Sequence, residues 1–334
     1  MKVSNAFDAT QIRAVGIQLY NRIDYARACL EALALQTHFN LETCAIHILV
    51  DKPSIKLQES RGFIDNREDI VAYALSLFPN ANFILPEFNL GIANSFLQLQ
   101  KNTFESLKSG EWAFFVEEDI ILSENHLSIA SNLIQAISDI PQIQKISLFQ
   151  GVYDLIPPTA PMHFGLTEGT KAFAMSKELH LQIQNRLDEV FTKIYSKQVE
   201  NRHRIAHLLT FGIHVTEPSK DFVVDECIAQ TGAISLLWNI GQAIDIGEIG
   251  EGGSRWFSNN SELFSEAEIL NINIISLNFE LKYELPRLFE ALHTTRLNRA
   301  IISEDAILSA TSITKSIRNA LSQMRKRLNS LSRF

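Results

Sequence analysis

Residues 112–122 read Trp112-Ala113-Phe114-Phe115-Val116-Glu117-Glu118-Asp119-Ile120-Ile121-Leu122, an apolar run that ends in three consecutive carboxylates and then turns apolar again. A short, continuous apolar run predicts a strand that is buried on both faces of a sheet. The three acids then lie at the carboxyl edge of that sheet, where open α/β sheets bind their ligands. Clustered carboxylates are costly without a cation, so the pattern favours a divalent metal with a phosphorylated ligand. Solvated acids at a strand end are the alternative.

The composition is that of a globular protein with a substantial core. The chain has 334 residues, of which 46% are hydrophobic and 20% are charged. Its net charge of −8 argues against a general nucleic-acid binder. The three cysteines, Cys29, Cys44 and Cys227, are scattered without metal-ligand spacing and indicate a cytoplasmic protein. Residues 1–13 lack the apolar core of a signal peptide, and no apolar run approaches the roughly 20 residues that span a bilayer.

Strand and helix patterns alternate through the first 150 residues. We expect strands at 14–20, 45–50 and 82–85 and in the apolar run before the acids, and helices at 23–36, 65–77, 91–107 and 124–137. This order predicts an α/β fold with a doubly wound, mostly parallel sheet and right-handed crossovers.

The pattern is less regular after the prolines at 157, 158 and 161, which mark a junction. We expect a long helix at 177–209, a short apolar run at 222–226 that ends in acids, and a helix at 227–238. Four glycines within 247–253 predict a mobile loop. The chain therefore divides into an α/β half at 1–155, a second α/β half at 156–285 and a helical tail at 286–334.

The end of the chain predicts an amphipathic helix with a basic face. Lysines and arginines surround a stripe of apolar residues that step by three or four, namely Ile313, Ile317, Leu321, Met324, Leu328 and Leu331. Such a helix on an acidic protein favours contact with an anionic membrane surface through 311–334. Packing against its own domain or against a partner subunit is an equal alternative.

Polar residues follow four of the predicted strands: Tyr20-Asn21-Arg22, Asp51, Asn89-Leu90-Gly91-Ile92-Ala93-Asn94 and Glu117-Glu118-Asp119. The carboxyl ends of parallel strands share one edge, so these side chains should converge. An arginine at a helix start suits a phosphate, and Asp51 is placed to accept hydrogen bonds from a base or ribose, with an N-cap or turn role as its alternative. Together they predict a nucleotide diphosphate site that is completed by a metal. The chain has neither GxxxxGK(S/T) nor GxGxxG, so ordinary P-loop and dinucleotide-binding interpretations fail.

These motifs resemble the nucleotide-sugar-binding half of GT-A-fold glycosyltransferases. Residues 15–51 resemble the opening strand–helix–strand of that fold, residues 89–94 are similar to its Asn- and Gly-containing helix start, and residues 116–120 look like its metal-binding DXD element. The likeness is closest to the inverting N-acetylglucosaminyltransferase I type and to family 2-like transferases, and it covers residues 15–127. Glu118 stands where that family has Asp, which is a departure from its pattern.

The resemblance implies a role for each matching residue. Asp119 would bind Mn²⁺ or Mg²⁺, Glu118 would contact the ribose or the sugar, and Glu117 would support them. The nucleotide part of a UDP- or GDP-sugar would lie against Tyr20, Asn21, Arg22, Asp51, Asn89 and Gly91, and its diphosphate or sugar would lie near Asn94.

An inverting transfer also needs a base that takes the proton of the acceptor hydroxyl. Asp225 is the candidate because it ends an apolar run directly before a predicted helix, and Glu226 is the alternative. Either acid could instead be an N-cap. In the glycine-rich segment 247–257, Ser254 or Arg255 would close over the diphosphate as part of a lid, and a plain surface loop is the other interpretation.

These residues and the resemblance together predict a metal-dependent glycosyltransferase. It would transfer a hexosyl or N-acetylhexosaminyl residue, with inversion, to a saccharide or lipid-linked acceptor. We expect it in the cytoplasm or on the inner membrane face, in the synthesis of bacterial surface polysaccharide or glycolipid. A retaining transferase, a nucleotidyltransferase and a non-catalytic nucleotide-sugar-binding scaffold remain as alternatives.

Overall fold

The computed structural model describes residues 11–55, 59, 64–149, 154–156, 164–167, 169–195, 201–238, 243–245, 282, 285–294 and 296. The segment 247–257, with Ser254 and Arg255, and the tail 311–334 lie outside these residues. None of the helices within the described ranges has the length and apolarity that a membrane crossing requires.

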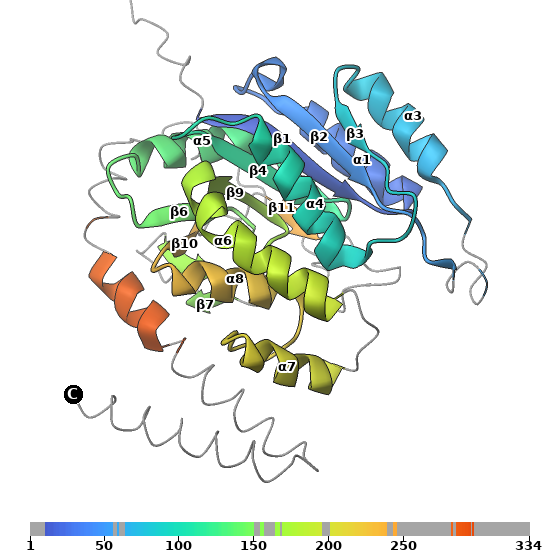
Figure 1. Cartoon of the computed structure of the whole chain (residues 1–334). Helices are drawn as coiled ribbons and strands as arrows, with labels where there is room; N and C mark the ends of the chain where they lie inside the picture. The colour runs from blue at the N-terminus through green and yellow to red at the C-terminus, as the bar shows by residue number, and fades with distance from the viewer. Residues whose placement is uncertain are drawn as a thin grey trace, which may run out of the picture.

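Nine of the described strands form one mixed sheet in the order β3-β2-β1-β4-β9-β6-β10-β8-β7 (Figure 1). Two of these strands, β8 and β9, run antiparallel to the other seven. In chain order the strands are β1 Ile12–Leu19, β2 Ala45–Val50, β3 Asn82–Ile84, β4 Trp112–Glu117, β6 Ile143–Ser147, β7 Asp154–Ile156, β8 Phe164–Thr167, β9 Ala172–Ser176 and β10 Ile234–Trp238. The α/β class and the mostly parallel sheet that the sequence predicts are confirmed.

Helices cover both faces of the sheet, as a doubly wound fold requires. One hydrophobic core holds α1 Ile23–Ala34, α3 Arg67–Leu77 and α5 His126–Ala136 against one face. A second core holds α4 Gly91–Glu105, α6 Lys177–Val190 and α8 Lys220–Gln230 against the other face (Figure 1). The shorter helical segments are η1 Leu41–Thr43, η2 Phe191–Tyr195 and α7 Asn201–Thr210.

Strand β4 lies between β1 and β9 in the sheet, and its side chains pack into both cores. Phe114 packs into one core and Phe115 into the other, as the alternation of side chains along a strand requires. Gly16 of β1 stands beside Phe115, and a Cβ at position 16 would lie 2.6 Å from Cδ1 of that ring. The aromatic ring therefore uses the space that a larger residue on β1 would occupy.

The structure corrects two expectations in the second half. Residues 222–226, expected as an apolar run that precedes a helix, lie within helix α8, and residues 234–238 form strand β10 where a helix was expected. Ser219 begins α8 by accepting a hydrogen bond from the backbone N–H of Phe222 at 3.4 Å. Nine of the eleven residues of α8 are buried, so the helix has no exposed polar face. The sequence therefore lacks the alternation of apolar and polar residues by which an amphipathic helix is recognised.

The long helix expected at 177–209 is divided in the structure. Helix α6 ends at Val190, a π-helical segment continues to Tyr195, and α7 begins at Asn201. The π segment buries Phe191 and Ile194, which shows that the change of pitch keeps this part of the chain against the core.

The boundary that the sequence places near residue 155 falls within strand β7 of the nine-stranded sheet. Strands β8, β9 and β10 follow that boundary and hydrogen-bond into the same sheet as β1, β2, β3, β4 and β6. A separate antiparallel pair joins β5 Ile120–Leu122 to β11 Ala243–Asp245 and sets Asp245 opposite Ile120. The helix at 285–294 buries Leu288 in the first core.

Candidate functional site

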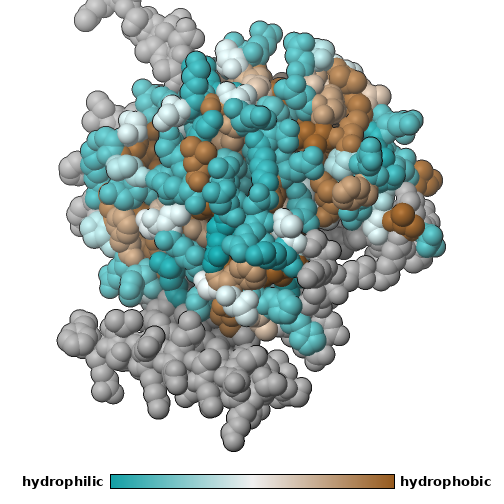
Figure 2. Space-filling view, viewed as in Figure 1, coloured by the Kyte–Doolittle hydropathy of each residue, from teal (hydrophilic) through white to brown (hydrophobic). Residues whose placement is uncertain are grey.

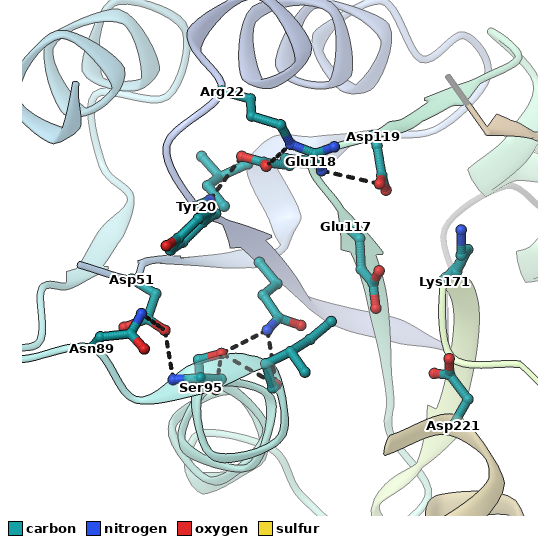
Figure 3. Close-up of a pocket in the computed structure, with 14 residues that line it drawn as sticks. Tyr20, Arg22, Asp51, Asn89, Ser95, Glu117, Glu118, Asp119, Lys171 and Asp221 are labelled. Carbon is teal, nitrogen blue, oxygen red and sulfur yellow. Dashed lines mark hydrogen bonds and ion pairs between the residues drawn. The ribbon is translucent and has the colours of Figure 1, made fainter. Parts of the chain in front are cut away.

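A cavity of about 420 Å³ opens at the carboxyl edge of β1, β2 and β4 (Figure 3). Its walls come from segments that are far apart in the sequence. The residues that line the cavity are Gln18, Leu19, Tyr20, Arg22, Asp51, Asn89, Gly91, Ile92, Ser95, Glu117, Glu118, Asp119, Lys171 and Asp221. The convergence that the sequence predicts therefore holds for Tyr20, Arg22, Asp51, Asn89, Gly91 and the three acids.

Arg22 holds the last two acids of the motif together. Its Nε donates to Glu118, and its Nη2 lies 3.0 Å from Oδ2 of Asp119. Glu118 also accepts the backbone N–H of Tyr20 at 2.7 Å, so its buried carboxylate is fixed by strand β1 and by the residue that precedes α1. Burial opposes the charge of Arg22, but the two carboxylates outweigh burial and raise the pKa of the guanidinium.

Asp119 lines the cavity and has one carboxylate oxygen without a partner among the described residues. Its residue is 8% exposed, and its Oδ1 is buried and has no hydrogen-bond partner in the described part of the chain. Buried polar atoms are normally paired, so an unpaired carboxylate oxygen in a cavity wall suits a cation. The described residues contain no cluster of three or more metal-ligating side chains. A metal held at Asp119 would also take ligand phosphates and water, which is a common arrangement for Mg²⁺.

Glu117 turns away from Arg22 and pairs with Lys220 of α8. Lys220 is almost fully buried, and its ammonium also lies 3.6 Å from Asp221 and 4.5 Å from the ring centroid of Phe96. Burial, reinforced by the neighbouring carboxylates and opposed by Lys220, raises the pKa of Glu117 to about 6. Glu117 is thus a pocket acid whose pKa lies above that of an ordinary glutamate.

Asp51 braces the turn that starts helix α4. Its Oδ1 accepts the backbone N–H groups of Lys52 at 2.9 Å and Leu90 at 3.0 Å, and its Oδ2 accepts that of Gly91 at 3.0 Å. Gly91 has φ +73°, a conformation that glycine adopts without strain. Asp51 therefore lines the cavity as expected, while both of its oxygens serve the N-terminus of α4 in the manner of a cap.

Asn21 and Asn94, which we expected at the nucleotide sugar, hydrogen-bond to backbone groups of the protein instead. The amide of Asn21 donates to the carbonyl of Ile64 at 2.6 Å and accepts from the N–H of Asn66 at 2.7 Å. Asn94 donates to the carbonyl of Leu90 at 3.2 Å within its own helix. Neither residue is among those that line the cavity.

Asp225 and Glu226 lie deeper in helix α8. Asp225 is buried and accepts from Lys145 of β6 at 2.5 Å, and the Lys145 side chain is fully buried. Burial raises the pKa of Asp225 to about 6 against the opposing effect of Lys145. Glu226 accepts from Gln230 at 2.9 Å. The cavity wall instead contains Asp221, one turn earlier on the same helix.

Sequence reasoning missed several residues of the cavity wall. Gln18 of β1 donates to Ser95 at 2.7 Å and to the carbonyl of Ile92 at 3.1 Å. Asp221 accepts from the hydroxyl of Thr170, and Lys171 pairs with Asp245. For Asp221, the nearest indication in the sequence was the pair Asp225 and Glu226, which begins four residues later. Lys171 had no signal, because only the pairing of β9 with β4 brings it to the acids.

No protein-family model and no curated protein sequence matches this chain. Among solved structures, Staphylococcus aureus TarS 1–349 in complex with UDP aligns with 16% identity and a TM-score of 0.37 over 54% of each chain. GalNAc-T7 with UDP, GalNAc and Mn²⁺ aligns with 12% identity and a TM-score of 0.44 over 70% of this chain and 42% of that one. The mannosyltransferase PcManGT from Pyrobaculum calidifontis, in complex with GDP-Man and Mn²⁺, aligns with 11% identity and a TM-score of 0.43 over 97% and 81%. The chain thus spans about half of the TarS fragment, and similarity this slight identifies no activity.

Proposed function

We propose that the protein is a metal-dependent glycosyltransferase that moves a hexosyl or N-acetylhexosaminyl residue from a UDP- or GDP-sugar to an acceptor hydroxyl with inversion. One observation carries the proposal. Asp119, with a buried and unpaired oxygen, shares a single cavity with Arg22 and with the turn at 89–91. A nucleoside diphosphate and its metal need this combination of an open carboxylate, a fixed cation and polar groups on one wall.

The charge of the cavity supports a bound cation. Its described lining carries five carboxylates and two cations, and Lys220 adds a third cation behind Glu117. Like charges in a poorly hydrated site repel one another, and a divalent cation would relieve that repulsion. When bound at Asp119, Mn²⁺ or Mg²⁺ would supply positive charge for the departing diphosphate.

The arrangement of the cavity suggests how the donor lies. Tyr20, Asp51 and Asn89 stand at one end, while Glu117 and Asp221 stand at the other (Figure 3). We place the nucleoside at the first end, the diphosphate near Arg22 and Asp119, and the transferred sugar toward the second end. This orientation puts the reacting carbon of the sugar on the side of the cavity where helix α8 begins.

Asp221 is the base that this orientation favours, in place of Asp225. Burial disfavours its charge, but Lys220 and the hydroxyl of Thr170 outweigh burial and lower the pKa of Asp221, so the carboxylate is ionised at neutral pH. It would take the proton of the acceptor hydroxyl as that oxygen bonds to the anomeric carbon. The bond from that carbon to the phosphate oxygen breaks at the same time, and its electron pair leaves with the diphosphate. Asp225 pairs with Lys145 through Oδ1 and is not among the residues that line the cavity.

The cellular role extends the same proposal. The acceptor would be a saccharide or a lipid-linked saccharide, in the assembly of bacterial surface polysaccharide or glycolipid on the cytoplasmic side of the membrane. The support is the basic, amphipathic pattern of 311–334, which suits an anionic lipid surface.

Thermal unfolding with nucleotides tests the proposed function. UDP or GDP at a hundred-fold excess over its dissociation constant should stabilise the full chain by about 2.7 kcal/mol, and the effect should require Mn²⁺ or Mg²⁺. A preference for nucleoside triphosphates would favour a nucleotidyltransferase instead. Metal-independent binding without any sugar transfer would favour a scaffold, and no response to any nucleotide would refute the proposal.

A further inference from the structure

Lys171 reaches the cavity from the side opposite Arg22. It directly precedes β9, and its carbonyl accepts the backbone N–H of Glu117 at 3.2 Å. The antiparallel register therefore places Lys171 across from the first acid of the motif. Figure 3 shows Asp119 between the two cations, with the Lys171 ammonium directed toward the cavity.

The ammonium of Lys171 has donors to spare. Within the described part of the chain it donates one hydrogen bond, to the carboxylate of Asp245. An ammonium has three N–H donors, so two are available to a ligand, and 22% of the side chain is exposed. Burial lowers the pKa of Lys171, but Glu117, Asp119 and Asp245 outweigh burial and raise it, so the group stays charged at physiological pH.

Arg22, unlike Lys171, is paired with two carboxylates. Its guanidinium is occupied by Glu118 and Asp119 at the centre of the cavity. Lys171 stands on the other side of Asp119 from Arg22, toward the end of the cavity that the proposed orientation gives to the sugar, so it would lie beside the phosphate that is bonded to the sugar (Figure 3). A compact ammonium with free donors is a common partner for phosphate oxygens.

We infer that Lys171 binds the sugar-linked phosphate of the donor and stabilises it as the leaving group. This inference rests on the proposed function. As the bond between the anomeric carbon and the phosphate oxygen breaks, negative charge grows on the diphosphate, and Lys171 donates hydrogen bonds to it while keeping its own proton. The acceptor proton goes to Asp221, so the exchange of bonds is complete without a further reactant.

The competing interpretation is that Lys171 only ties β9 to β11 through Asp245. Calorimetric titration of the full chain separates the two, with saturating Mn²⁺ and with UDP, UMP, GDP and GMP as ligands. In Lys171→Met, the diphosphate that the wild type prefers should bind about ten- to a hundred-fold more weakly, while the matching monophosphate should bind as before. Lys171→Arg should retain most of the affinity for the diphosphate, because it keeps the charge.

Lys171→Met removes the cation that pairs with the buried Asp245, so the double variant Lys171→Met/Asp245→Asn provides a neutral replacement of the pair. It should show the same selective loss of diphosphate binding. Unchanged diphosphate affinity in both variants, or an equal loss for diphosphate and monophosphate in the double variant, would overturn the role of Lys171 and leave the proposed function standing. A wild-type protein that binds none of the four nucleotides would overturn the proposed function, and this inference with it.

Discussion

Arg22 neutralises only one oxygen of Asp119. The guanidinium lies 3.0 Å from Oδ2, while Oδ1 is buried in the cavity wall without a partner among the described residues. The arginine orients the carboxylate and partly offsets its charge, and it leaves the second oxygen available to a ligand. This division of one carboxylate between a fixed cation and an unpaired oxygen is the feature on which the proposed metal site rests.

Asp119→Asn should remove the metal-dependent part of nucleotide stabilisation, because the amide keeps the shape of the side chain but loses the charge that attracts the cation. The stabilisation of about 2.7 kcal/mol expected with Mn²⁺ and a hundred-fold excess of nucleotide should fall to its metal-free level. Asp188→Asn changes an exposed acid paired with Lys101 and serves as the matched control. An undiminished response to Mn²⁺ in Asp119→Asn would exclude Asp119 as the metal ligand.

Asp221→Asn should bind the donor normally but transfer sugar about 10²- to 10⁴-fold more slowly, since the variant lacks a base for the acceptor hydroxyl. Release of nucleoside diphosphate in the presence of acceptor measures the rate, and calorimetry measures donor binding. Asp188→Asn again provides the control. Wild-type turnover in Asp221→Asn would show that Asp221 is not the base.

Asp225→Ala should destabilise the fold by about 3–5 kcal/mol, because the fully buried Lys145 would lose its ion-pair partner. The double variant Lys145→Met/Asp225→Leu removes both charges and should recover most of this loss. Urea denaturation of the two variants and the wild type gives the comparison. If Asp225→Ala unfolds at the wild-type urea concentration, the ion pair has no structural role.

Glu117 should make the wild type less stable as the pH rises from about 4.5 to about 6. Its pKa is higher in the folded protein than in the unfolded chain, so the folded state binds the proton more tightly and loses that advantage as the group ionises. The free energy of unfolding relative to Glu117→Gln should fall by on the order of 2 kcal/mol across this range. Urea denaturation at several pH values measures the difference, and a flat or rising difference would show that Lys220 holds the pKa at or below its ordinary value.

Asp51→Ala should cost about 2 kcal/mol of stability, since the N–H groups of Leu90 and Gly91 would lose their acceptor at the start of α4. Asn94→Ala removes a weaker bond to Leu90 in the same turn and should cost about 0.5 kcal/mol. Chemical denaturation compares the two, and hydrogen exchange at Leu90 and Gly91 should accelerate only in Asp51→Ala. Equal small losses would show that the turn holds without the carboxylate.

The first half of the fold was predictable because its patterns are local. The sequence places strand β2 at the residues where the structure has it, and helices α1, α3, α4 and α5 lie within a few residues of their expected ranges. Parallel strands that alternate with helices must end at one edge, so the convergence of Arg22, Asp51 and Asp119 followed from element order alone. The second half was harder because helix α8 is buried on nearly every side and so lacks an amphipathic period.

The sequence by itself determined the α/β class, the strand that ends in Glu117, Glu118 and Asp119, and the edge of the sheet at which a ligand would bind. Only the tertiary structure decided what each of these acids faces. Lys171 and Lys220 reach Glu117 through strand register and helix packing across long stretches of chain, and no local pattern encodes such pairings. The environment of a carboxylate, and hence its charge and its freedom to hold a ligand, depends on neighbours that folding alone brings together.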